Sequence, residues 1–362
     1  MKHIVCTLLF LSIFYKSDAQ KLAVSTDSIR RADSIPELGY AVITADAIKD
    51  LNVLGFHKST LKNDDTKALP DDYFHLGSNT KAITAFIAGY LVERKKINWG
   101  TKFFTLFPDW QAAANPAYVN ITLADLLSHR ARIKPFTSGA EFQSAPKSTG
   151  TKSEQRKIFA KYLLTNEPLP LNKEPYNYSN AGYSIAALML EEASGKTWED
   201  LVEEVLGKGL KLRYKFGWPN RTDDNQPSGH WMEENVLTPL PSTTSYNLNL
   251  IEPAGDISMP LADYAKLIQM NLAGLKGQNN FLKAGTYNYM HYGLEKYAMG
   301  WLNVNTPEKH ISEHAGSAGT FYCYTLINKD KNIAYIVTAN SATENALKGV
   351  FKVLEVMIKS SE

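Results

Sequence analysis

Cysteine, long charged runs and clustered metal ligands are all scarce in this sequence. Only Cys6 and Cys323 occur among 362 residues, and 39 Lys+Arg against 37 Asp+Glu give a formal net charge of +2. With no long basic run, the charge gives no reason to expect a nucleic-acid partner. The sequence has no His-Glu-x-x-His pattern and no clustered Cys/His spacing, so we expect no metallohydrolase, no metal site and no cofactor. A composition of 44% hydrophobic and 21% charged residues is ordinary for a globular protein.

The first 19 residues are typical of a secretory signal peptide. Three residues that include Lys2 precede an apolar run over residues 4–14, and small residues lie just before Gln20, where we expect cleavage. The run is shorter than the ~20 residues that span a bilayer, and no later run is long enough. Cleavage would leave Cys323 alone, which excludes an intramolecular disulfide, and we expect its thiol in a strand of the core. We therefore expect a periplasmic or secreted protein with no stable membrane span.

Predicted strands lie at both ends of the chain, with predicted helices between them. The whole of residues 20–362 is expected to form one domain of mixed α+β class: an antiparallel sheet flanked by helices, built from about 35–77 and 290–362, with a helical region, about 78–289, inserted. Residues 20–36 show too little pattern for an assignment. The predicted strands are 40–44, 51–56, 73–76, 297–304, 320–327 and 333–339, and the main predicted helices follow Ser78, Thr122, Ser153 and Ser258 or cover 181–193 and 344–358.

One stretch places a hydroxyl and an amine three positions apart at the start of a helix. Ser78-Asn79-Thr80-Lys81 precedes apolar residues in the i, i+3, i+4, i+7 pattern, so Ser78 and Lys81 share a helix face. A desolvated, neutral lysine can activate a serine, and a first-turn backbone N–H is free to stabilise an oxyanion. The same pattern also fits a capping serine with a solvated lysine. Ser-x-x-Lys recurs at Ser59 and Ser144, but neither of these opens a helix.

Two further segments could complete such a site. Tyr178-Ser179-Asn180 ends a polar loop immediately before a helix, a good place to present a phenol and an amide to a cleft. His314-Ala315-Gly316 runs into the best strand pair of the chain, where glycine would let a substrate backbone approach closely. Each of these also has an ordinary structural interpretation, as a half-buried tyrosine or a structural histidine.

Together these motifs resemble the serine β-lactamase and penicillin-binding protein superfamily, especially its class C β-lactamase, D-aminopeptidase and esterase branch. The resemblance covers nearly all of residues 20–362. It rests on the following segments in this order: Ser78-Asn79-Thr80-Lys81, Leu126-Leu127-Ser128-His129, Tyr178-Ser179-Asn180, Pro253-Ala254-Gly255-Asp256, His314-Ala315-Gly316 and Asn340. It implies a β-lactamase/transpeptidase-like fold with a cleft between the sheet and the helices.

The resemblance also implies a role for each residue. Ser78 would be the nucleophile, Lys81 its activating neighbour, and Tyr178 the group that passes a proton to the leaving group. The substrate-binding residues would be Asn180, His314, Gly316 and Ser317, with the backbone N–H groups of Ser78 and Ser317 forming the oxyanion hole. Whether Lys81 or Tyr178 is the acylation base stays open, because desolvation would lower the pKa of the lysine whereas a charged lysine would lower that of the tyrosine.

Two departures bear on the substrate. The third motif begins with His314 where relatives often have lysine, and a neutral histidine is poorly suited to a substrate carboxylate. The segment after His129 holds Arg130, Arg132 and Lys134, whose side chains could line the cleft or be solvated, and we expect them to be solvated. We therefore expect an exported serine hydrolase that acts on an amide or ester, whether peptide, D-amino-acid peptide, ester or β-lactam. The alternative is a binding or sensor domain that is acylated without turning over.

Overall fold

The computed structural model describes residues 20–171 and 173–361, so the predicted signal peptide lies outside the described residues. Within the described part, no helix is both long and apolar enough to cross a membrane. Residues 20–32 form a helix that the sequence pattern did not predict. Its buried positions include Thr26 and Arg30 beside Leu22, and polar residues on the inner face weaken the apolar periodicity.

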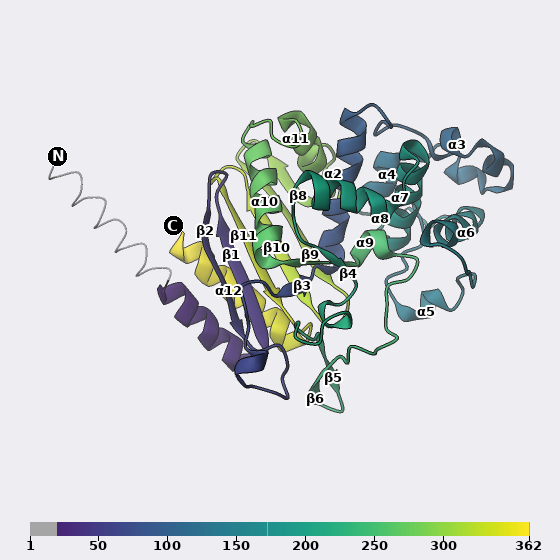
Figure 1. Cartoon of the computed structure of the whole chain (residues 1–362). Helices are drawn as coiled ribbons and strands as arrows, with labels where there is room; N and C mark the ends of the chain where they lie inside the picture. Colours follow the sequence, from purple (N-terminus) through teal and green to yellow (C-terminus); the bar gives the residue numbers. More distant parts are fainter. Residues whose placement is uncertain (1–19, 172, 362) are drawn as a thin grey trace.

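A six-stranded antiparallel sheet joins the two ends of the chain. Its strand order is β2-β1-β11-β10-β9-β8, and Figure 1 shows the purple N-terminal strands beside the yellow-green C-terminal ones. The prediction of an α+β fold with an antiparallel sheet is therefore confirmed. The strands are β1 (Glu37–Ile43), β2 (Ile48–Gly55), β8 (Leu302–Thr306), β9 (Lys309–Ser317), β10 (Tyr322–Asn328) and β11 (Ile333–Ala339).

Alternating side chains give this sheet two apolar faces. On β1, Leu38, Tyr40 and Val42 belong to a core shared with α12 (Glu344–Ser360) and Leu22 of the N-terminal helix. Ala41 and Ile43 point to the larger core, which includes α10 (Leu261–Leu275). Period-2 alternation of this kind is expected where both faces of a sheet are covered. Cys323 is buried on the second face, as predicted.

The helical region lies beside the sheet (Figure 1). Its helices are α2 (Thr80–Glu93), α3 (Phe103–Leu106), α4 (Leu123–Leu127), α5 (Gly139–Phe142), α6 (Lys152–Thr165), α7 (Asn180–Ser194), α8 (Trp198–Val202), which continues as a π-helix over Glu203–Gly209, α9 (Glu252–Gly255) and α11 (Ala284–Tyr292). The long helices α2 and α7 are buried along most of their length and carry the main residues of the candidate site at their N-terminal ends.

Three local predictions are corrected by the structure. Thr151, not Ser153, caps α6, because its hydroxyl and Glu154 form a reciprocal capping box. Ile158 is exposed, since α6 turns Arg156 inward instead. Ser258 lies in β7 (Ile257–Pro260), which precedes α10, and pairs with β3 (Tyr73–His75) and β4 (Lys215–Phe216).

The C-terminal strands and the long loop also differ from expectation. The predicted strand from Tyr297 begins only at Leu302, although Tyr297 forms an isolated bridge to that residue. The segment 218–245, predicted to be loop, contains a hairpin of β5 (His230–Glu233) and β6 (Val236–Pro239). These differences leave the architecture unchanged.

Candidate active site

Ser78 lies in a short turn between β3 and α2, next to the end of β9. The turn is a 3-10 helix over Gly77–Asn79 that runs directly into α2. Gly77 has φ +51°, and a Cβ on it would lie 2.4 Å from the backbone nitrogen of Ser317. A side chain at Gly77 would therefore push β9 away from Ser78, so glycine is needed both for its backbone conformation and for this contact.

Lys81 is fully buried one turn after Ser78. Its Nζ lies 3.0 Å from Ser78 Oγ, 2.7 Å from Asn180 Oδ1 and 2.9 Å from the carbonyl oxygen of Ala254. Lys81 itself lies on α2, Asn180 on α7 and Ala254 on α9, so the amine lies where three helices meet. The predicted i, i+3 approach of hydroxyl and amine is present in the structure.

The surroundings of Lys81 favour its neutral form. Burial holds the pKa of the Lys81 amine well below its usual range. Among the residues that the structure describes, no carboxylate forms an ion pair with it. A neutral amine has two N–H donors and one lone pair. Asn180 Oδ1 and Ala254 O can take the two donors, which leaves the lone pair for the Ser78 hydroxyl.

Tyr178 and Asn180 reach the same place from the loop before α7. The Lys81 Nζ lies 4.7 Å from the centroid of the Tyr178 ring. Burial raises the pKa of the Tyr178 phenol despite its hydrogen bond with Ser78. Asn180 is the first residue of α7, and its Nδ2 donates to the carbonyl of Phe136 at 2.9 Å. Both Tyr178 and Asn180 therefore lie beside the amine that contacts Ser78.

His129 holds the Tyr178 loop in place, a role the sequence did not reveal. The backbone N–H of Ser179 donates to His129 Nδ1 at 3.1 Å, and that of Asn177 donates to the His129 carbonyl at 2.8 Å. The His129 ring lies 4.4 Å from the Tyr178 ring, centroid to centroid. Burial, and then the charge of Lys81, lower the pKa of His129 well below its usual range. The imidazole is therefore a neutral acceptor that positions the loop carrying Tyr178.

His314 faces the site from β9 and is held by Tyr297. Its Nδ1 lies 2.8 Å from the carbonyl of Ala315, to which it donates, so Nε2 accepts a hydrogen bond from the Tyr297 hydroxyl at 3.0 Å. Burial, followed by the charge of Lys81, lowers the pKa of His314 to about 3. The histidine is thus uncharged at any ordinary pH. Tyr297 was predicted only as a strand residue, and nothing in its local sequence indicates its contact with His314.

Gly316 and Ser317 complete the side of the site formed by the sheet. A Cβ on Gly316 would lie 2.1 Å from the carbonyl oxygen of Leu76, in the chain segment that leads to Ser78. The glycine is therefore required for β9 to pack against the nucleophile turn itself, rather than only for access of a substrate. The Ser317 hydroxyl accepts from the backbone N–H of Gly319, and the residue is exposed.

The basic side chains after His129 were predicted to be solvated, but in the structure they are hydrogen-bonded to neighbouring loops. The Arg130 guanidinium donates to the carbonyls of Tyr297 at 2.7 Å and Glu295 at 2.8 Å. Arg132 donates to Leu169 O, and Lys134 donates to Asn166 Oδ1. The three cations hold neighbouring loops in place through neutral oxygens, and Arg130 fixes the segment that carries Tyr297.

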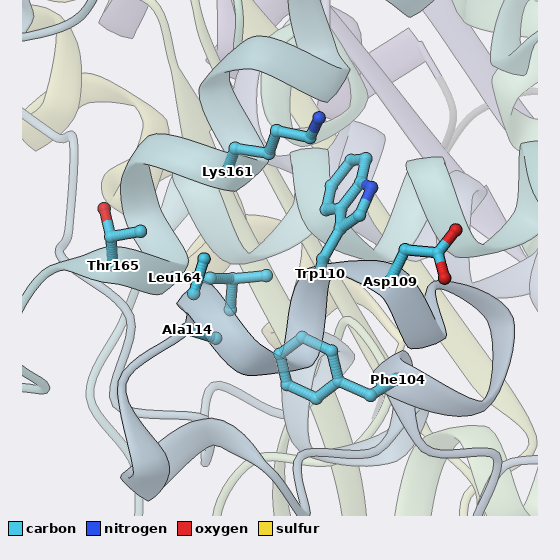
Figure 2. Close-up of a pocket in the computed structure, with 8 residues that line it drawn as sticks. Phe104, Asp109, Trp110, Ala114, Lys161, Leu164 and Thr165 are labelled. Carbon is cyan, nitrogen blue, oxygen red and sulfur yellow. The ribbon is translucent and has the colours of Figure 1, made fainter.

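Neither of the other Ser-x-x-Lys patterns builds a comparable site. The hydroxyls of Ser59 and Ser144 donate to backbone carbonyls, of Leu237 and Glu141 respectively. A well-formed cavity of about 270 Å³ lies elsewhere, between α3 and α6, and is lined by Phe104, Trp110 and Lys161 among others (Figure 2). It contains none of the predicted site residues, so the chemistry and this cavity are separate features.

Comparison with known proteins shows the class to which this fold and site belong. The family model described as Beta-lactamase matches residues 32–351, and the chain belongs to this family. The predicted superfamily is thereby confirmed.

Three particular proteins illustrate the similarity. Unguisins hydrolase ungD' of Aspergillus campestris is 26% identical over 250 residues, which are 64% of this chain and 43% of that protein. A class C beta lactamase from Rhodobacter sphaeroides superposes with a TM-score of 0.70 at 17% identity, covering 93% of this chain and 99% of the other. The D-amino acid amidase from Ochrobactrum anthropi SV3 has a TM-score of 0.72 at 18% identity, covering 94% and 100%. These three proteins show the range of relatives with which the chain shares sequence or fold.

The relatives differ from this chain in length. The chain spans about half the length of the curated relatives it matches. At identities below 25%, the solved structures establish the fold that the two molecules share.

Proposed function

We propose that this protein is an exported serine hydrolase that forms an acyl-enzyme at Ser78 on an amide or ester substrate and releases it with water. The observation that carries the proposal is the buried Lys81 amine, 3.0 Å from Ser78 Oγ, with no carboxylate paired to it among the described residues. A lysine in that setting is a base rather than a structural cation. The family match and the amidase and β-lactamase folds support the same class of reaction.

Lys81 is the better candidate for the base that activates Ser78. Burial lowers the pKa of Lys81 and raises that of Tyr178, so near neutral pH the amine is available as a base while the phenol keeps its proton. The proton of Ser78 Oγ passes to Lys81 Nζ as Oγ attacks the substrate carbonyl. The sequence left open whether Lys81 or Tyr178 is the acylation base, and we propose that it is Lys81.

Tyr178 would then act as the proton donor. Its protonated phenol gives a proton to the leaving nitrogen or oxygen as the tetrahedral intermediate collapses, and the proton on Lys81 restores it. In the second half-reaction water attacks the acyl carbonyl and a proton returns to Ser78 Oγ. The backbone N–H groups of Ser78 and Ser317 would stabilise the oxyanion, consistent with the close packing of Gly77 against Ser317.

The charges around the site favour a neutral substrate group over a carboxylate. Asn180 has one Nδ2 hydrogen committed to Phe136, so the second can donate to a substrate carbonyl. His314, with its pKa lowered to about 3, offers no positive charge. We therefore favour esters and amides without a carboxylate at the position facing His314. Export to the periplasm or medium, inferred from residues 1–19, is part of the proposal.

The nucleophile is tested with a covalent probe. The wild type should gain one fluorophosphonate adduct by mass spectrometry on the peptide that contains Ser78, and Ser78→Ala should gain none. Turnover of p-nitrophenyl esters or D-aminoacyl anilides should fall by several orders of magnitude in the variant. Ser59→Ala is the matched control and should label normally.

Two outcomes would contradict this assignment. An adduct that survives Ser78→Ala places the nucleophile elsewhere. A stoichiometric burst without steady-state turnover on every substrate tested would favour the binding or sensor protein instead.

The substrate preference is tested with His314→Lys. A lysine at position 314 would be protonated when a substrate carboxylate lies beside it, so we expect kcat/KM for carboxylate-bearing substrates to rise about tenfold relative to matched neutral esters, which corresponds to ~1.4 kcal/mol. His310→Lys, at a partly exposed histidine that pairs with Asp330, should leave the ratio unchanged. An unchanged ratio in His314→Lys would show that His314 does not face the substrate's charged group.

A further inference from the structure

Three ionisable side chains from separate segments meet at one end of the sheet, in a cluster that contains none of the predicted site residues. Glu37 is the first residue of β1, His57 follows the end of β2, and Asp72 immediately precedes β3. One ligand atom from each lies within 4.8 Å of the others, and all three residues are at most 2% exposed. Because they are 20 and 15 positions apart with no motif, sequence spacing does not reveal them.

The cluster has more acceptor oxygens than donors. His57 Nε2 lies 2.9 Å from Asp72 Oδ2, which also accepts from the backbone N–H of Leu69. Both oxygens of Glu37 and Asp72 Oδ1 are buried without a hydrogen-bond partner within the described part of the chain. Buried polar atoms are nearly always satisfied, so three orphaned carboxylate oxygens in one place point to a missing positive group.

We propose that Glu37, His57 and Asp72 form a structural zinc site. Zinc binds imidazole nitrogen and carboxylate oxygen, usually with four donors in a structural site. His57, Asp72 and Glu37 supply imidazole and carboxylate donors from three residues, Glu37 has a second oxygen that can also reach the ion, and one Zn²⁺ balances the two carboxylate charges. The competing solution is two protons, one on Glu37 and one on His57.

The three side chains would have to shift to hold the ion. Donor atoms from different residues on one tetrahedral zinc ion at ~2.1 Å lie about 3.4 Å from each other. His57 Nε2 would give up its 2.9 Å contact with Asp72 Oδ2 to face the ion, and the widest separation of up to 4.8 Å would close.

The backbone around the cluster is already fixed for such a role. The Asn340 side chain accepts from Glu37 N at 2.8 Å and donates to the carbonyl of His57 at 3.1 Å. These two bonds fix the backbone positions of Glu37 and His57 relative to each other. Arg30, the nearby cation, is committed to Asp27 and to the carbonyls of Ile35 and Pro36. A zinc ion would therefore clip β1 to the segment 56–72 that leads into β3 and Ser78.

The test measures zinc content and stability of the whole chain. Protein unfolded with a chelator and refolded with ZnCl₂ should contain one zinc per chain by elemental mass spectrometry. It should melt several degrees higher than protein refolded without zinc, because a ligand bound only by the folded state stabilises that state. Cobalt substituted for zinc should give the visible absorption bands of a tetrahedral nitrogen and oxygen site.

Two variants distinguish a bound zinc ion from protons as the positive charge that balances the cluster. Glu37→Gln should lower the affinity for zinc by roughly tenfold or more and abolish the zinc-dependent rise in Tm. His310→Ala removes a partly exposed histidine that pairs with Asp330 at 2.9 Å and should change neither. If protons hold the cluster, the amide introduced by Glu37→Gln can donate to Asp72 much as a protonated glutamate would, and this variant should be as stable as wild type.

The proposal is overturned if refolded wild type binds no zinc and its Tm does not respond to the metal. It is also overturned if Glu37→Gln retains the bound zinc. Neither result bears on Ser78, since the adduct and turnover assays report on the proposed hydrolase separately.

Discussion

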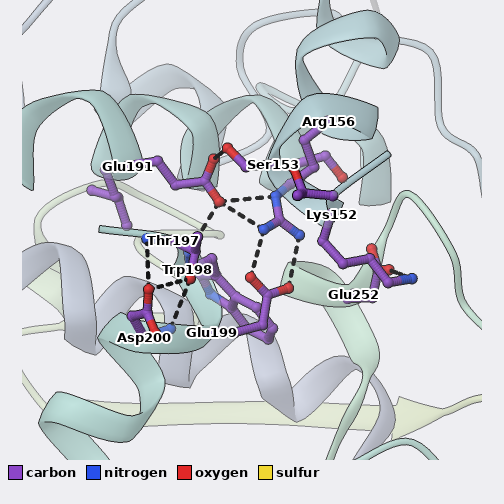
Figure 3. Close-up of polar contacts among 12 residues, drawn as sticks. Lys152, Ser153, Arg156, Glu191, Thr197, Trp198, Glu199, Asp200 and Glu252 are labelled. Atoms are coloured by element: carbon purple, nitrogen blue, oxygen red, sulfur yellow. Dashed lines mark hydrogen bonds and ion pairs between the residues drawn. The ribbon is translucent and has the colours of Figure 1, made fainter. Parts of the chain in front are cut away.

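Two buried basic side chains, Lys81 and Arg156, differ in whether carboxylates lie beside them. Both have side chains shielded from solvent. Arg156 of α6 donates to Glu191 at 2.7 Å and to Glu199 at 2.7 Å, and Figure 3 shows its guanidinium between the two carboxylates. Lys81 contacts neutral oxygens: a hydroxyl, an amide and a backbone carbonyl.

The difference decides what each group can do. Burial opposes the charge on Arg156, but its two glutamates outweigh that effect and raise its pKa. For Lys81 nothing offsets burial, and its pKa falls. Arg156 is thus permanently charged and links α6 to α7 and α8 through ion pairs, whereas Lys81 can give up its proton. Burying a basic side chain without a carboxylate partner lowers the stability of the folded state, but it makes that side chain available as a base.

The largest expected effect is a loss of activity when Lys81 is replaced by a permanently charged arginine. In Lys81→Arg the side chain keeps a charge that cannot be removed, so it cannot accept the proton of Ser78. We expect kcat/KM to fall about 10²–10⁴-fold, measured with the ester substrates used for Ser78→Ala. The control Lys161→Arg changes a lysine that lies over the Trp110 ring in the separate cavity. Near-normal activity in Lys81→Arg would mean that Lys81 is not the base.

The next effect comes from removing the charge of Arg156. Arg156→Met leaves Glu191 and Glu199 without their shared partner, and breaking a buried ion pair costs about 3–5 kcal/mol of unfolding free energy. Urea denaturation at pH 7 measures this loss, while kcat of the protein that remains folded should change little. Arg31→Met, at a mostly exposed arginine paired with Asp27, should cost under ~1 kcal/mol. Equal costs in the two variants would show that the Arg156 network contributes no more than a surface pair.

Local sequence predicted the part of the site that depends on one helix turn. Ser78 and Lys81 are three positions apart, so helix geometry alone brings them together. Tyr178 and His314 required the order of motifs along the chain, because only tertiary packing brings their segments to Ser78. His129 and Tyr297 were missed as supports, since a positive φ at His129 and a hydroxyl bond to His314 have no local signature.

The sequence predicted the elements of the fold where apolar alternation was strong. The prediction failed where polar residues were buried. The residues of β1, β10 and β11 alternate clearly between two cores, and their strands were predicted nearly in place. Arg156 turns inward on α6, so the apparent apolar stripe through Ile158 was wrong. The same cause hid the helix over 20–32, whose buried face includes Arg30.

Per pH unit, the smallest change is a pH dependence of stability that Lys81 should show and Arg156 should not. Below about 10.4 an unfolded lysine is protonated, whereas folded Lys81 is neutral down to its lowered pKa. The unfolded state therefore binds more protons in this window, and the stability of the wild type should rise with pH by up to ~1.4 kcal/mol per unit relative to Lys81→Met. The Arg156→Met difference should stay flat, because arginine is charged in both states. Urea denaturation of the three proteins from pH 6 to 9 gives these slopes, and a flat difference for Lys81→Met would mean that buried Lys81 keeps its proton.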